Sequence, residues 1–133
     1  ESNWEMKITF VGTEKVVKTH ILRLRAPLTF EALRDKTREK GYYTVRSRGN
    51  IGSPKAYWML LVNLNRGIEK KEYTEYKKGD VVYCPRQDAL YMIYDENPTI
   101  RMPVHYIGEI VEGIENFKGL RNGVMAKIEL TTV

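Results

Sequence analysis

The segment DVVYCPRQDALYMIY, residues 80–94, contains two hydrophobic stretches separated by a short polar turn at residues 86–88. Aromatic and aliphatic side chains dominate both stretches, and these residue types are enriched in β-strands. A polar turn between two such runs is typical of paired strands. The segment therefore predicts two neighbouring β-strands, whose aromatic side chains either line a binding site or form the buried half of the strand pair.

The residues before this segment alternate in the same way. In residues 5–10, hydrophobic and polar side chains follow one another with a period of two, as in a half-buried strand. After a turn at residues 12–14, residues 15–25 continue the alternation, which predicts a β-hairpin. Because Leu22 and Leu24 alternate with arginines, we expect the second strand to extend to residue 25.

Residues 26–41, APLTFEALRDKTREKG, change to a helical pattern. Thr29 has the residue type of a helix cap, and Leu28 and Leu33 have the spacing of a hydrophobic staple. The apolar face is narrow and centres on Phe30 and Leu33, so we expect this helix to lie on a sheet with much of its length in water.

The remaining strands follow from short hydrophobic runs between turn signals. Residues 56–65 are nearly continuously hydrophobic, as in a strand covered on both faces, whereas residues 66–80 are polar and predict a mobile connection. Further strands are predicted at 42–48, 104–113 and 124–130, with a helical turn at 114–120. Seven or so short strands and one helix predict a mainly β fold, an antiparallel barrel or sandwich with the helix over one opening.

The composition is that of a globular protein. The 133 residues are 42% hydrophobic and 29% charged, which predicts a single domain over residues 1–133. No apolar run approaches the length of a membrane span and the N-terminus lacks a signal-peptide pattern, so we expect a cytoplasmic protein without membrane contact. With Cys84 as the only cysteine and two histidines far apart, neither a disulfide, a metal site nor a cofactor is predicted.

The formal charge of +5 raises the question of a polyanion partner. The basic groups RLR at 23–25 and RSR at 46–48 are separated by acidic residues, and no long basic tract exists. Scattered charge of this kind is typical of a solvated surface, so nucleic acid is a disfavoured partner.

The segment VHYIGEIVEGIENFKGL, residues 104–120, resembles the cyclophilin stretch Val-Phe-Gly-Lys-Val-x-Glu-Gly with the helix after it, and residues 123–133 resemble the last cyclophilin strand. The chain is more similar to the small uncharacterised cyclophilin-like proteins of prokaryotes. Their GDV-x-Y-x-P strand start corresponds to residues 79–85, and their Asn-Pro loop to residues 97–99. The resemblance implies a closed antiparallel cyclophilin-like β-barrel with a capping helix and, on one outer face, a groove where cyclophilins bind a prolyl peptide.

In cyclophilins that groove holds an arginine, an apolar floor, a glutamine and a rim histidine or tryptophan. Aligning Gly108 with the cyclophilin glycine places Val104 at the histidine position, and His105 then falls on the opposite face of the strand. The floor strand corresponds to residues 90–92, which lack the glutamine. No catalytic residue is therefore predicted. The candidate groove residues are Arg46, Arg48, Tyr83, Met92, Tyr94 and Val104.

Three functions remain open at this stage. The favoured one is a non-catalytic module that binds a small molecule or an extended, proline-containing peptide in the groove. The alternatives are a weak peptidyl-prolyl cis-trans isomerase that uses Arg46 or Arg48, and a binder of nucleic acid or acidic partners. Either a monomer or a dimer is expected, and exposure of Trp4 or Trp58 would favour the dimer.

Overall fold

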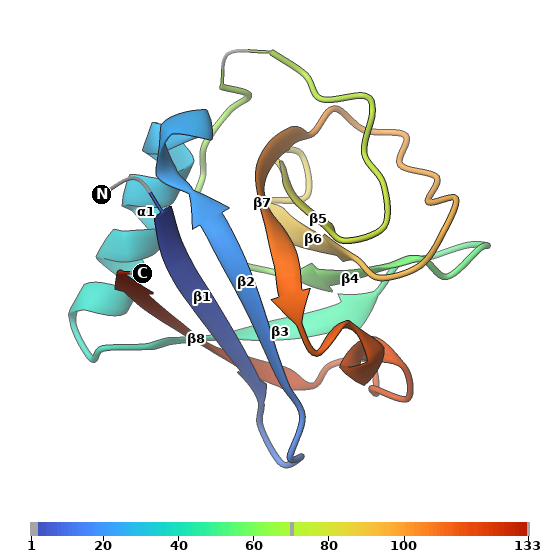
Figure 1. Ribbon diagram of the computed structural model, residues 1–133, viewed down its shortest axis with the longest axis horizontal. Helices are drawn as coiled ribbons and strands as arrows, with labels where there is room; N and C mark the ends of the chain where they lie inside the picture. Colours follow the sequence, from blue (N-terminus) through green and yellow to red (C-terminus); the bar gives the residue numbers. More distant parts are fainter. Residues whose placement is uncertain (1–2, 70, 133) are drawn as a thin grey trace.

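The structure is a computed structural model that describes residues 3–69 and 71–132. Its strands are β1 (Asn3–Phe10), β2 (Val16–Leu22), β3 (Tyr43–Gly49), β4 (Tyr57–Leu60), β5 (Asp80–Cys84), β6 (Ala89–Ile93), β7 (His105–Glu112) and β8 (Met125–Thr132). The helix α1 (Pro27–Arg38) follows the 3-10 turn η1 (Arg23–Arg25), and a second 3-10 turn, η2 (Ile114–Phe117), follows β7. In this described part the strands close an antiparallel barrel in the order β1-β2-β7-β5-β6-β4-β3-β8 (Figure 1). The predicted mainly β barrel, capping helix and C-terminal helical turn are confirmed.

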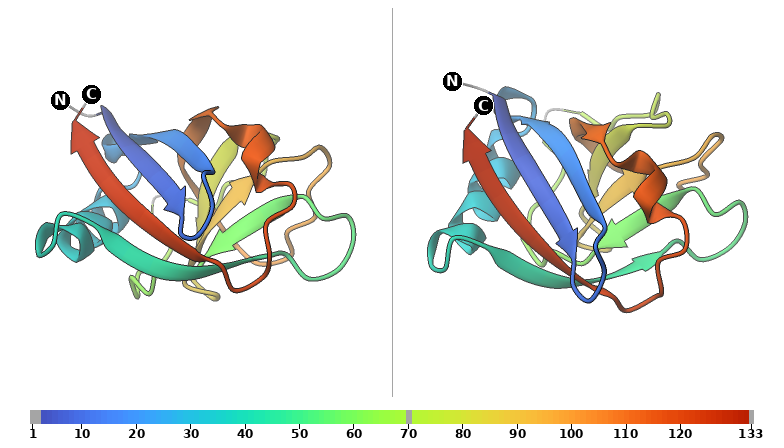
Figure 2. Two further views of the ribbon diagram at one scale, coloured as in Figure 1. Left: turned by 90° about the horizontal axis from the view of Figure 1, so that it is seen from below. Right: turned by 60° about the horizontal axis from the view of Figure 1, so that its bottom comes forward.

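The barrel interior is filled by alternate side chains of its strands. On β1, Met6, Ile8 and Phe10 are fully buried in the interior cluster, as the period of two requires. The helix adds Phe30 and Leu33 to the same cluster, and Figure 2 shows it at one end of the barrel. Thus α1 closes one opening with its narrow apolar face and leaves its other face in water.

Strands β4, β5 and β6 are buried on both faces. Trp58 and Tyr83 point into the interior cluster, whereas Tyr57 and Tyr91 belong to a second cluster on the outside of the barrel. Residues from two long connections, Tyr73, Tyr76, Ile100 and Met102, pack over this outer cluster. The aromatic residues of the 80–94 segment therefore build two layers of core, and residues 71–79, expected to be mobile, form part of the cover.

Three local predictions around the start of the helix were wrong. Strand β2 ends at Leu22, because residues 23–25 wind into a 3-10 turn that carries the chain onto the helix and leaves Leu24 66% exposed. The helix begins at Pro27, with Ala26 at the N-cap and no side-chain cap bond, so Thr29 lies inside the first turn. Leu28 is 61% exposed and forms no staple.

The glycines of the IGEIVEG segment have a steric explanation. Gly108 pairs with Ile21 of β2, and a Cβ at position 108 would lie 2.1 Å from the carbonyl oxygen of His20. Gly113 has φ 85° and a Cβ there would lie 2.4 Å from the carbonyl oxygen of Val16. Any side chain at either position would push β7 away from β2, so these glycines allow the barrel to close.

We predict that Gly108→Ala lowers the free energy of unfolding by about 1–3 kcal/mol, the usual range for a group forced into packed structure. Gly67→Ala is the matched control, because a Cβ at position 67 meets nothing within 4 Å. Its effect should stay within about 0.5 kcal/mol. Urea unfolding followed by tryptophan fluorescence measures both, and equal stability of the two variants would contradict the steric explanation.

Candidate binding sites

One surface depression lies over the outer faces of β4 and β6, and we call it the β4–β6 groove. Its volume is about 200 Å³. The residues that matter for its chemistry are Arg48, Tyr57, Met59, Tyr91, Arg101 and Met102. Strands β3, β4 and β6 supply the first four and the 94–104 connection supplies the last two, so a rigid sheet positions most of the groove.

The floor of the groove is aromatic and thioether-rich. The rings of Tyr57 and Tyr91 stack with centroids 4.5 Å apart and an interplanar angle of 26°. Met59 is the direct cross-strand partner of Tyr91. The Tyr91 hydroxyl is covered and makes no hydrogen bond of good geometry with any described residue. Methionine and tyrosine together give an apolar floor that adapts to the shape of a ligand.

Two arginines flank this floor, and neither forms an ion pair with a carboxylate among residues 3–69 and 71–132. Arg48 is half-buried, whereas Arg101 is exposed. Burial raises the pKa values of Tyr57 and Tyr91, and the Arg48 guanidinium acts against this rise at both phenols. Arg48 is therefore close enough to interact electrostatically with groups at the groove floor.

Of the six candidate groove residues, the structure places Arg48 in this groove. Val104 is buried in the outer cluster beneath the covering connection, and Arg46 is exposed on β3 outside the groove. Tyr83 and Met92 are fully buried inside the barrel, and Tyr94 stacks on Phe117 at 5.5 Å beside the same interior cluster. The structure therefore does not bring the six together. The groove is lined by the other face of β6, which carries Tyr91, and not by the face that carries Met92.

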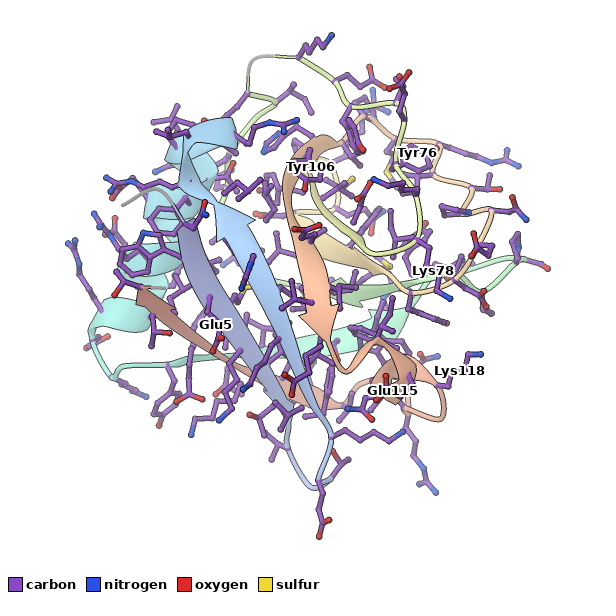
Figure 3. The ribbon with its side chains drawn as sticks, viewed as in Figure 1. Glu5, Tyr76, Lys78, Tyr106, Glu115 and Lys118 are labelled. Atoms are coloured by element: carbon purple, nitrogen blue, oxygen red, sulfur yellow. The ribbon has the colours of Figure 1, made fainter. Side chains whose placement is uncertain are left out.

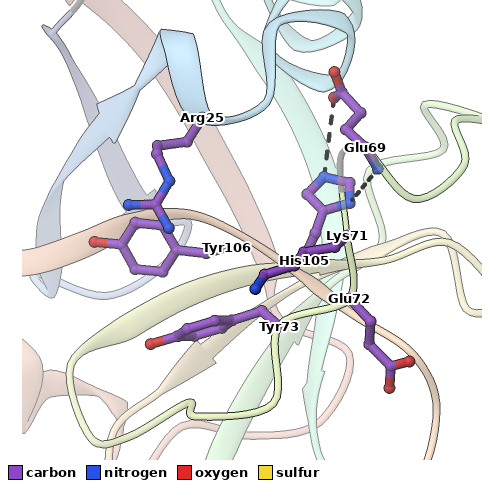
Figure 4. A pocket seen from close by; sticks show the side chains of 7 residues that line it. All are labelled: Arg25, Glu69, Lys71, Glu72, Tyr73, His105 and Tyr106. Atoms are coloured by element: carbon purple, nitrogen blue, oxygen red, sulfur yellow. Dashed lines mark hydrogen bonds and ion pairs between the residues drawn. The ribbon is translucent and has the colours of Figure 1, made fainter.

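A second depression lies between η1, Glu69, residues 71–73 and the start of β7, and we call it the β7 pocket (Figure 4). Its volume is about 280 Å³. Its walls include Arg25, Glu69, Lys71, Tyr73, His105 and Tyr106. No described residue lines both this pocket and the groove.

Glu69 replaces the missing cap of the helix. Its carboxylate accepts the amide N–H of Leu28 at 2.8 Å, the amide N–H of Thr29 at 2.7 Å and the Thr29 hydroxyl at 2.6 Å. A carboxylate at a helix N-terminus also interacts favourably with the helix dipole. Burial alone would raise the pKa of Glu69, but these hydrogen bonds and His105 bring it below its ordinary value.

His105 is buried beside this cap with both ring nitrogens in use. Nδ1 accepts the amide N–H of Glu69 at 3.3 Å, which leaves the remaining proton on Nε2. Nε2 lies 3.1 Å from the Thr29 hydroxyl oxygen, whose own proton goes to Glu69. Burial lowers the pKa of His105, and Glu69 opposes this shift. The imidazole is thus a neutral structural link, and no ring nitrogen is left to act as a general base.

Tyr73 and Tyr106 form the aromatic side of the β7 pocket, with centroids 5.2 Å apart at 67°. The Tyr73 hydroxyl donates to the Asp80 carboxylate at 2.9 Å, and burial together with this carboxylate raises the pKa of Tyr73 to about 12. The Tyr76 hydroxyl donates to the Ile100 carbonyl at 3.1 Å and so joins the two covering connections. Figure 3 shows Tyr106 on β7 and Tyr76 on the connection across from it.

The described residues contain no group of three or more His, Cys, Asp or Glu side chains placed to hold a metal ion. Nor does any helix within them combine the length and hydropathy of a membrane span. Trp58 is 4% exposed, and Trp4 is half-buried against Phe30.

No protein-family model matches the sequence, and a search of curated proteins finds no match. Among solved structures, the fold is similar to the hypothetical protein AF2241 from Archaeoglobus fulgidus, with a TM-score of 0.72, 19% identity, and coverage of 96% of this chain and 95% of that one. It is also similar to McbB, solved in complex with tryptophan, with a TM-score of 0.70 and 17% identity over 93% of this chain. That match covers 44% of McbB, so this chain spans less than half of its length. At these identities the likeness shows the fold alone.

Sequence reasoning missed the β7 pocket and most of the groove floor. Glu69 and Tyr73 lie in the polar segment that predicted only a mobile connection, and their partners are distant in sequence. One signal was available: a helix that starts with Ala26 and Pro27 has no side-chain cap of its own, so its amide groups need an acceptor from elsewhere. The polar segment 66–80 contains several carboxylates that could provide this acceptor.

We predict that Glu69→Gln lowers the free energy of unfolding at pH 7 by about 1–3 kcal/mol, because a charged acceptor of three hydrogen bonds is lost. The folded pKa of Glu69 is below the unfolded value, so its contribution is complete above about pH 4.5 and is lost as the pH falls through the folded pKa. The gap between wild type and Glu69→Gln should therefore narrow at pH 3.

Glu72→Gln is the matched control, because Glu72 lies three residues away with its carboxylate exposed. It should match the wild type at both pH values in urea unfolding. A Glu69→Gln protein as stable as Glu72→Gln at pH 7 would show that the carboxylate does not hold the helix.

Proposed function

We propose that the protein is a non-catalytic binding module whose β4–β6 groove holds an extended peptide. The observation that carries the proposal is the pairing of Arg48 and Arg101, both without a described carboxylate partner, with a floor of stacked tyrosines and methionines. Guanidinium groups bind carbonyl and carboxylate oxygens, and an apolar floor binds one or two side chains.

The small volume and open shape of the groove favour one side chain of an extended peptide over a drug-sized molecule that has to be enclosed. Pockets for drug-sized molecules usually measure about 300–1,000 Å³. The groove, at about 200 Å³, is smaller and is open along the surface. A peptide anchored by one side chain, with its backbone carbonyls turned toward Arg48, makes good use of such a site. The resemblance to cyclophilin-like proteins gives the same expectation, since cyclophilins bind prolyl peptides on an outer face of the barrel.

Two observations support binding without chemistry. The described groove lining contains no carboxylate, histidine, cysteine or lysine. His105, the residue after the one that the resemblance aligns with the cyclophilin histidine, lies outside the groove with both ring nitrogens engaged. Prolyl isomerisation, however, needs only a donor near the proline nitrogen and an apolar pocket. Arg48 beside Tyr57 supplies both, and this keeps a weak isomerase as the second candidate.

A titration with the peptide Ala-Ala-Pro-Phe tests the proposal. Amide NMR signals of residues 57–59, 91 and 101–102 should shift. Arg48→Gln should weaken binding about tenfold or more, the usual cost of losing a hydrogen bond to a charged group. Arg46→Gln is the matched control, since Arg46 lies on the same strand outside the groove. Equal effects of the two variants, or shifts confined to other regions, would refute the groove.

The same samples separate the second candidate. Exchange spectroscopy measures cis-trans interconversion of the Ala-Pro bond, which takes tens of seconds without a catalyst. We expect the rate to be unchanged by the protein. Acceleration that disappears in Arg48→Gln would make the protein an isomerase. Because McbB was solved with tryptophan, tryptophan serves as a small-molecule competitor, and displacement of the peptide by it would assign the groove to small ligands instead.

A further inference from the structure

We propose that the β7 pocket is a second, independent binding site that takes a small planar anion of the aromatic carboxylate class. It shares no described lining residue with the β4–β6 groove, and different elements build it. The inference goes beyond the proposed peptide site and stands on other residues. Its basis is the combination of two cationic groups, two tyrosine rings and the buried cap of the helix.

The pocket contains two cationic side chains that an anion could bind. Neither Arg25 nor Lys71 forms an ion pair with a carboxylate in the described part of the chain. Glu69 directs its carboxylate to the helix N-terminus, where its charge is already used by three hydrogen bonds. In Figure 4 Glu72 extends away from Arg25 and the two tyrosine rings. Arg25 and Lys71 are therefore free of ion pairs with the described carboxylates, while Glu69 and Glu72 also line the pocket and Asp80 lies at the Tyr73 hydroxyl.

The walls favour a flat molecule. The Arg25 guanidinium lies over the Tyr106 ring, with its central carbon 4.5 Å from the ring centroid, and Tyr73 meets Tyr106 edge to face. A guanidinium stacked on a ring keeps its N–H groups at the edges of its plane, ready for a bidentate contact with a carboxylate. An aromatic ring attached to that carboxylate would find tyrosine surfaces beside it.

The pocket is organised before any ligand arrives. Tyr73 is held at its hydroxyl by Asp80 at 2.9 Å and at its amide N–H by the Val104 carbonyl at 2.8 Å. His105 is fixed by Thr29 and by the amide of Glu69. Fixed walls reduce the entropy lost on binding. A volume of about 280 Å³, close to the lower end for small-molecule pockets, sets the ligand at about one ring with its substituents.

Three probes of similar size separate charge from shape. Benzoate carries both features, benzamide keeps the ring without the charge, and cyclohexanecarboxylate keeps the charge without the flat ring. Amide NMR titration should show benzoate shifting signals of residues 71–73 and 105–106, with each of the other probes binding at least about tenfold more weakly. Benzamide binding as tightly as benzoate would overturn the assignment to an anion. Cyclohexanecarboxylate binding as tightly would overturn the assignment to a planar ligand.

Variants then locate the site. Arg25→Gln and Lys71→Gln change exposed side chains, and each should weaken benzoate binding about tenfold. Arg48→Gln in the groove is the matched control and should leave benzoate binding unchanged while it impairs peptide binding. The proposal fails if benzoate does not bind at millimolar concentration, if its shifts map to the groove, or if Arg25→Gln and Lys71→Gln both bind it like the wild type. None of these results would alter the peptide experiment, so the two proposals fail separately.

Discussion

Glu69 links three parts of the molecule: the first turn of α1, the start of β7 and the segment that covers the barrel. The first turn of α1 has amide groups without intrahelical acceptors, and neither Ala26 nor Pro27 offers a side chain to satisfy them. Glu69 supplies the acceptor from about 40 residues further along the chain. The same residue donates its backbone N–H to His105 of β7. The position of the helix over the barrel opening, the orientation of His105 and the path of the covering segment are therefore set together.

The second constraint is the burial of β4, β5 and β6 on both faces. A sheet with hydrophobic side chains on both sides needs a cover on the outside of the barrel. Residues 61–69 and 71–79, together with the 94–104 connection, provide it. Two aspartates hold the first connection in place. Asp80 accepts from Tyr73 and from the amide of Lys77, and Asp88 accepts from the amides of Leu64 and Asn65. Both surface depressions lie at the edges of these covers, where loops on a rigid scaffold commonly carry binding residues.

The barrel could be predicted because hydrophobic and polar residues alternate clearly in every strand that has one face exposed to solvent. Met6, Ile8 and Phe10 mark the inner face of β1 without ambiguity. The same reasoning cannot tell the two faces of β5 and β6 apart, because alternate residues on both faces are hydrophobic. It therefore predicts Tyr83 and Met92 as groove residues, whereas both point into the barrel. Their neighbours on the other parity, including Tyr91, form the groove floor. The contacts of Glu69 were beyond reach for another reason, since no local pattern encodes a partner 36 to 41 residues away.

The unpaired arginines are the feature that stability alone does not explain. A half-buried guanidinium such as Arg48 loses part of its hydration and gains no described carboxylate in return. A neutral side chain of similar shape at that position would avoid this cost and would still cover Tyr57 and Tyr91. Elsewhere in the fold the carboxylates of Glu69, Asp80 and Asp88 accept hydrogen bonds from buried or half-buried donors. No described carboxylate is placed beside Arg48 in the same way. A ligand that brings its own carbonyl or carboxylate oxygen would supply the missing partner, and this supports the binding function that we propose for the groove.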